Sequence, residues 1–304
     1  MKPPEHRIHA SESSVEDDAD SALYPRQNPE AVIALLALAD DLKRRIDVGK
    51  ASLHPESDLW SKILEKMRVD WTYHSNAIEG STLSRGDTLF FLQEGLTVEG
   101  KPFKDFLDAR NHAEAIDLLF DVVANARPIS EGLIKEVNAL LLNGVSQTPA
   151  RTPARTPAGQ AVSKTVHAGQ YKRLPNHVLQ QDGTLHQYVV PEQVAPQMQT
   201  LVAWINGNQP VHPIVRAGVA HYHLVRIHPF DDGNGRGARL LMNLILLKAG
   251  FFPAVIRREQ KRTYLEALEI ADQGDITPFI QFMASQLIET LQTVQSDLER
   301  FGTA

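Results

Sequence analysis

Apolar residues recur at intervals of three and four along most of this chain, and no other feature limits its fold as strongly. After Asn28-Pro29-Glu30, for example, one helical stripe is formed by Val32, Leu35, Leu36, Ala39, Leu42 and Ile46. Residues with this spacing share one face of an α-helix, so each such stripe predicts an amphipathic helix. Because the pattern returns in most later segments, the sequence predicts an all-α fold.

Single residues mark where these helices start and stop. Asn28 and Ser130 suit N-caps, Pro29 suits a first helical position, and Gly49 and Gly80 suit the position just beyond a helix end. Spacing and caps together predict helices over 30–49, 57–79, 86–96, 106–124, 130–142, 195–206, 214–226, 235–249, 263–273 and 277–299.

Two segments depart from the helical pattern. Proline stands at every fourth position of a tandem repeat that begins at Thr148-Pro149-Ala150-Arg151, and this spacing excludes a helix. We expect an extended, solvated Pro-rich loop at 146–160, with recognition by a proline-binding partner as the alternative. Further along, Asp182-Gly183 separates two extended runs and predicts a β-hairpin.

Composition narrows the setting in which the chain works. Cysteine is absent, which excludes disulfides, thiolate metal sites and a catalytic thiol. A net charge of −6 and a pI near 6.1 argue against a nucleic-acid partner. No apolar run approaches the length of a membrane span and no signal peptide is visible, so we expect a cytoplasmic protein without a membrane partner. Residues 1–27 are acidic and too polar to bury a face, which predicts a disordered tail.

The stretch from Ile227 to Arg239 gathers the chain's reactive groups between two predicted helices. Pro229 moves His228 out of the helical region and so ends the first helix. Three glycines and Asn234 permit a tight loop whose backbone N–H groups point into one cavity. The second helix begins at once, so its positive end faces the same cavity.

Charged side chains complete this anion site. Arg236 and Arg239 are three residues apart and share a helical face. Asp232 offers oxygens that suit Mg²⁺, and His228 can accept a proton near neutral pH. The set fits a phosphate-bearing nucleotide together with a nucleophile that must lose its proton. The spacing of a Walker A loop is missing, which excludes that class.

From His228 to Arg239 the chain resembles the signature of Fic proteins, His-x-Phe-x-Asp/Glu-Gly-Asn-x-Arg-x-x-Arg, at every fixed position. The resemblance covers residues 60–285. It implies the Fic fold, a helical bundle with a small β-hairpin flap. On that basis we expect N-terminal helices over 28–100, a catalytic core over 101–304, and the flap at 167–190.

The resemblance also implies protein AMPylation, in which AMP passes from Mg-ATP to a Ser, Thr or Tyr hydroxyl of a target protein or of the enzyme itself. His228 would be the general base and Asp232 would hold Mg²⁺. The nucleotide would be bound by Gly233, Asn234, Gly235, Arg236 and Arg239, with Tyr264 and Asp272 at the adenine. The target would be held by the flap residues Gly169, Gln170, Tyr171 and Lys172 through strand addition.

Ser75-Asn76-Ala77-Ile78-Glu79-Gly80 resembles the inhibitory helix of the same family, here within the predicted helix over 57–80. Glu79 would reach Arg239 and occupy the position meant for the γ-phosphate, with Ser75 and Gly80 as the other inhibitory positions. In some relatives this glutamate positions a water that removes AMP, so a de-AMPylase is an alternative. Transfer of another phospho group, a non-enzymatic nucleotide-binding module and a homodimer also stay open.

His221 and His223 lie close enough to His228 to suggest zinc. Residues two apart face different sides of a helix, however, and no fourth ligand is suitably spaced. We therefore expect His221 to be packed and hydrogen-bonded instead.

Overall fold

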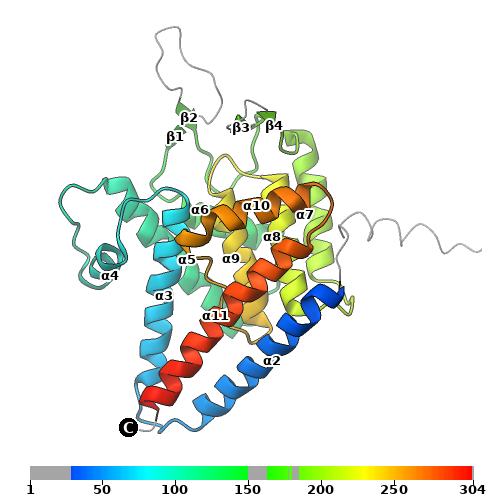
Figure 1. Ribbon diagram of the computed structural model, residues 1–304. Helices are drawn as coiled ribbons and strands as arrows, with labels where there is room; N and C mark the ends of the chain where they lie inside the picture. The colour runs from blue at the N-terminus through cyan, green and yellow to red at the C-terminus, as the bar shows by residue number, and fades with distance from the viewer. Residues whose placement is uncertain (1–28, 150–162, 177, 180–184, 303–304) are drawn as a thin grey trace, which may run out of the picture.

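The computed structural model describes residues 29–149, 163–176, 178–179 and 185–302, and within these ranges the protein is mostly helical (Figure 1). The helices are α2 (Pro29–Ala51), α3 (Leu59–Ile78), α4 (Arg85–Glu94), α5 (Phe103–Ala124), α6 (Glu131–Leu141), α7 (Pro191–Ile205), α8 (Pro213–Ile227), α9 (Asn234–Lys248), the 3-10 turn η1 (Arg258–Gln260), α10 (Lys261–Asp272) and α11 (Thr277–Phe301). The all-α prediction is confirmed, and the predicted helix ends are off by a few residues at most.

Local chemistry fixes several of these ends. The Ser130 hydroxyl accepts a hydrogen bond from the Leu133 N–H at 3.1 Å, so it caps α6 as predicted. Ser84 and Asp87 form a reciprocal capping box at the start of α4. Gly80, one residue past the C-cap of α3, has φ of +102°, a backbone conformation that side chains disfavour.

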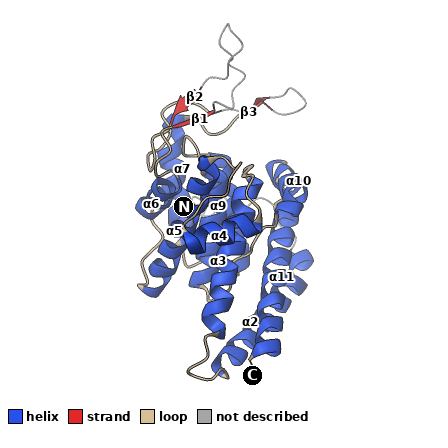
Figure 2. Ribbon diagram, turned by 90° about the vertical axis from the view of Figure 1, so that its left-hand side faces the viewer, coloured by secondary structure: helices blue, strands red, loops and turns tan. Residues whose placement is uncertain are grey.

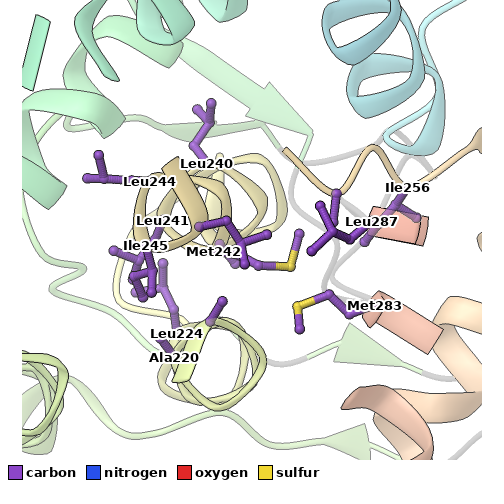
Figure 3. Packing of buried hydrophobic residues seen from close by; sticks show 14 of the residues in the cluster. Ala220, Leu224, Leu240, Leu241, Met242, Leu244, Ile245, Ile256, Met283 and Leu287 are labelled. Carbon is purple, nitrogen blue, oxygen red and sulfur yellow. The ribbon is translucent and has the colours of Figure 1, made fainter. Parts of the chain in front are cut away.

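Helix α9 lies at the centre of the bundle, against α8, α5 and α6. Leu240, Met242 and Leu244 of α9 are buried. In Figure 3, Ile245 of α9 lies beside Leu224 of α8, and Met242 points toward Leu287 of α11. Because α9 starts at the signature loop, this packed core fixes where that loop sits.

The N-terminal helix α2 runs alongside α11, and the two have the same direction (Figure 1). Near the start of both helices, the Gln281 amide donates to the Ala31 carbonyl at 3.0 Å. Near their ends, Leu298 packs close to Gly49. Val32 of α2 belongs to the same hydrophobic cluster as the residues around α9. Helices α2 and α3 therefore share one core with the rest of the bundle, whereas Leu83, Phe91 and Val98 pack against Phe106 in a second, smaller cluster.

Two short antiparallel strand pairs lie together at one end of the bundle (Figure 2). Strand β3 (Val178–Leu179) pairs with β4 (Leu185–His186), so the predicted hairpin is present, although Asp182-Gly183 lies outside the described residues. Strand β1 (Gln147–Pro149) pairs with β2 (Ser163–Thr165), where only a loop is predicted. The repeat has no alternating apolar pattern that would reveal a strand. Its residues 150–162, like the tail at 1–27, lie outside the described ranges.

Within the described ranges, no helix has the length and apolar character that a bilayer crossing requires.

Core packing around α9 leads to a stability prediction. Leu287 is fully buried, so Leu287→Ala should lower the free energy of unfolding by about 2–5 kcal/mol through lost contacts and a cavity. Ile33 on α2 is 57% exposed, and Ile33→Ala should stay within about 0.5 kcal/mol of the parent. Urea denaturation followed by circular dichroism measures both. Equal effects would contradict the packing described here.

Candidate active site

His228 follows the last residue of α8 and closes that helix. Its N–H donates to the Leu224 carbonyl at 3.0 Å, and its backbone has φ 51° and ψ 58°. The helix ends before Pro229, as the sequence predicts. His228 leaves the helical region by adopting the left-handed conformation, which closes the final turn. Positive φ is uncommon outside glycine, and such residues cluster at functional sites.

The imidazole of His228 is oriented by two contacts. Its Nδ1 lies 3.3 Å from the Val225 carbonyl, and since a carbonyl only accepts, this contact favours a hydrogen on Nδ1 and a lone pair on Nε2. On its face, the ring of Tyr188 stacks at a centroid distance of 3.8 Å and an interplanar angle of 19°. His228 can thus present Nε2 as a base.

Asn234 closes the signature loop. Its side-chain oxygen accepts from the Phe230 N–H and its amide donates to the Phe230 carbonyl, both at 2.9 Å. This side chain is therefore committed to the loop, and Asn234 can contribute to an anion site through its backbone N–H. Phe230 itself is buried. From α6, the Asn138 amide supports the loop by donating to the Asp232 carbonyl at 3.0 Å.

The carboxylate of Asp232 lies at the start of α9, beside Gly233. One oxygen accepts from the Gly233 N–H at 2.6 Å. Among the described residues, no cluster of three or more His, Asp or Glu could hold a metal by itself. Mg²⁺ is commonly bound by one or two carboxylates, substrate phosphates and water, so a single aspartate beside a phosphate site fits that ion.

Arg239 joins α9 to α3. Its guanidinium is buried and donates to the Ser75 hydroxyl at 3.0 Å, to the Ser75 carbonyl at 2.9 Å and to Glu79 Oε1 at 2.9 Å. A Cβ built on Gly235 would collide with that same Oε1. The Glu79 carboxylate therefore rests against the first turn of α9, where the helix dipole favours an anion.

Arg236 is bound to a residue that the sequence motifs do not single out. It is buried and its guanidinium donates to Asp108 of α5 at 2.8 Å. Burial acts to lower the pKa of Arg236, but the charges of Asp108 and Asp232 outweigh it and raise the pKa. The Asp108 carbonyl also accepts from Asn76 of α3 at 3.4 Å. Each signature arginine is thus paired with a carboxylate from another helix.

A sequence signal for Asp108 does exist. Four buried polar side chains of α5 share the face that also carries its apolar residues: Asp105, Asp108, Asn111 and His112. Polar groups on a buried helix face need partners, so this pattern indicates a polar contact with another element. It does not reveal which element that is. Asn138 of α6 offers the same signal, because it lies on the apolar face with Ile134 and Leu141, whereas Tyr188 offers none.

The two residues predicted at the adenine lie in separate surroundings. Tyr264 is buried, its hydroxyl is 3.0 Å from His221 Nε2, and burial raises its pKa to about 12. Asp272 is exposed at the end of α10 and accepts from the Tyr222 hydroxyl at 3.1 Å. His221 is packed and hydrogen-bonded, as expected.

The first residues of the flap are joined to the signature loop. Tyr171 forms a bridge with Phe230, and the Lys172 N–H donates to the Pro229 carbonyl at 2.8 Å. The Lys172 side chain is buried, and its ammonium contacts Asn176 at 2.7 Å and the Ile227 carbonyl at 3.4 Å. Lys172 thus neutralises the negative end of α8. Gly169 is held by Asn138, whereas Gln170 is exposed.

These features define a class of site: a helix N-terminus with two arginines and an aspartate, facing a histidine base on a helical scaffold. Residues 128–246 match the model of the Fic/DOC family. Residues 128–246 are therefore a Fic/DOC family domain.

Two curated relatives illustrate the similarity in sequence. Protein adenylyltransferase fic-1 of Caenorhabditis elegans is 32% identical over 226 residues, which cover 73% of this chain and 40% of the relative. Protein adenylyltransferase Fic of Aedes aegypti is 30% identical over 285 residues, or 91% of this chain and 52% of the relative. This chain thus spans about half or less of the length of these curated relatives.

Solved structures give the same family. A Fic domain containing signaling protein from Bacteroides thetaiotaomicron is 29% identical with a TM-score of 0.74, and the match covers 86% of this chain and 97% of that one. A Fic family protein from Desulfovibrio desulfuricans is 26% identical with a TM-score of 0.70, over 90% and 76% of the respective chains.

Buried histidines predict acid sensitivity. Burial, with a smaller contribution from Arg239, lowers the pKa of His221 to about 3, and burial lowers the pKa of His112 as well. Below about pH 6.5 these histidines therefore bind protons in the unfolded chain but stay neutral in the native state. The free energy of unfolding then falls by up to about 1.4 kcal/mol for each histidine per unit decrease in pH.

Urea denaturation at pH 7.5 and pH 5.5 tests this expectation. The stability difference between the two pH values should be smaller in His221→Gln than in the parent. It should be unchanged in His54→Gln, because His54 is exposed. An undiminished difference in His221→Gln would contradict the assignment.

The Arg236–Asp108 pair yields a second stability prediction. Asp108→Asn leaves a buried guanidinium without its counter-charge and should cost about 3–5 kcal/mol of unfolding free energy. The double variant Asp108→Asn with Arg236→Met should lose clearly less unfolding free energy than the sum of the two single variants, and a double-mutant cycle measures this difference. Asp117→Asn, which breaks a more exposed pair with Arg68, should cost at most about 1 kcal/mol. Additive effects at Asp108 and Arg236 would contradict direct pairing.

Proposed function

We propose that this protein is an adenylyltransferase that moves AMP from ATP to a hydroxyl group of a protein and that Glu79 restrains it. The observation that carries the proposal is the signature loop, which joins the His228 base to an anion-binding helix start. The names of the curated relatives, which are 30–35% identical, support the same reaction.

The chemistry follows from these groups. The acceptor hydroxyl gives its proton to Nε2 of His228 while its oxygen bonds to the α-phosphorus. The bond from that phosphorus to the bridging oxygen breaks, and pyrophosphate leaves with the bonding electrons. Backbone N–H groups at the start of α9 and the charges of Arg236 and Arg239 stabilise the phosphates. Mg²⁺ would be held by Asp232 and would supply further charge neutralisation.

The restraint works through competition for Arg239. A γ-phosphate needs this guanidinium, but in the described conformation its Nε and Nη2 donate to Ser75 and Glu79. The Glu79 carboxylate also lies where a phosphate would approach Gly235. ATP would therefore bind productively only in the fraction of molecules in which Glu79 has moved away.

Removing Glu79 should release the activity. With ATP labelled at the α-phosphate, Glu79→Gly should incorporate label at least about tenfold faster than the wild type, because every molecule is then competent. His228→Ala in the same background should be inactive for lack of a base. Glu99→Gly, at an exposed turn, should match the wild type.

Mass spectrometry of the Glu79→Gly protein after incubation identifies the transferred group and any self-modification. A mass other than AMP would correct the nucleotide, and no transfer would overturn the proposal. The reverse reaction is tested on an AMP-modified protein. AMP release by the wild type that is lost in Glu79→Gly would show instead that Glu79 positions a hydrolytic water.

A further inference from the structure

One aromatic side chain connects the flap hairpin to the base. Tyr188 lies two residues beyond β4, and its ring covers one face of the His228 imidazole at 3.8 Å. His186, at the end of β4, meets the same tyrosine edge-on at 4.7 Å. The hydrogen bonds between Phe230 and Asn234 that close the signature loop do not involve Tyr188, so closing the loop does not by itself require this contact.

The stack opposes a rotation of the His228 ring that the contact at Nδ1 does not prevent. The Val225 carbonyl holds the imidazole at Nδ1, which is one edge of the ring. Rotation about that edge would swing Nε2 away from the acceptor hydroxyl. A ring stacked on the face opposes this rotation, and it also offers a π surface to the imidazolium that forms when the proton arrives.

We propose that Tyr188 is a positioning residue that aligns Nε2 of His228 for proton transfer and makes this alignment depend on the flap. The inference rests on the proposed role of His228 as the base. Because Tyr188 lies two residues beyond β4, the placement of its ring depends on where the flap hairpin sits, and the described conformation already holds the ring over the base.

Kinetics in the Glu79→Gly background test the alignment. Tyr188→Leu should lower kcat by about tenfold or more, since small misplacements of a catalytic group are costly. The Kd of this variant for ATP, measured by calorimetry without a target protein, should change less than about twofold, because α9 and its arginines bind the phosphates. Tyr188→Phe keeps the ring and should restore kcat. Tyr73→Leu removes a tyrosine that contacts His74 outside the site, and should leave kcat unchanged.

Histidine NMR provides a readout that needs no activity. Ring protons of His228, assigned by their disappearance in His228→Ala, should be shifted upfield by the stacked ring in the parent and in Tyr188→Phe, but not in Tyr188→Leu. Unchanged kcat in Tyr188→Leu, or the same NMR shift in all three proteins, would overturn the inference. Absence of AMP transfer by Glu79→Gly itself would instead overturn the proposed function, and the NMR would still report on the stack.

Discussion

A guanidinium buried between two helices is the interaction on which the rest of this site depends. Arg239 is 3% exposed, and a buried cation without a counter-charge costs several kcal/mol. Ser75 and Glu79 meet that need, and so they hold α3 against the start of α9. A phosphate could meet it equally well. The same requirement therefore explains both why the Glu79 carboxylate lies at Arg239 and why a phosphate would compete with it.

The second arginine ties a further helix into this arrangement. Arg236 is paired with Asp108 of α5, whose carbonyl also accepts from Asn76 of α3. Helices α3, α5 and α9 thus meet through polar contacts at one end of the bundle, while α8, α9 and α11 meet through apolar packing (Figure 3). Polar contacts suit the site, because its arginines must be able to bind either a carboxylate or a phosphate. Close apolar packing suits the scaffold, because it fixes the position of the site.

The sequence predicts the helices well because apolar spacing and caps are local signals, as Ser130 and Gly80 illustrate. It also brings Glu79 and Arg239 together, though only through resemblance to a family. What it could not predict depends on packing in three dimensions: the pairing of Asp108 with Arg236, the stack of Tyr188 on His228, and the use of the Asn234 side chain to close its own loop. Spacing alone cannot show which distant element a buried polar group meets.

The short ladder between β1 and β2 has a consequence for how this chain can change over evolutionary time. Its register, Thr148 opposite Lys164, brings the two ends of the repeat-containing segment side by side. Extra copies inserted between fixed ends add only a loop-closure cost, about 0.6 kcal/mol for each doubling of length. Repeat number can therefore drift, or a foreign sequence can be inserted there, with little effect on the helices that carry the chemistry.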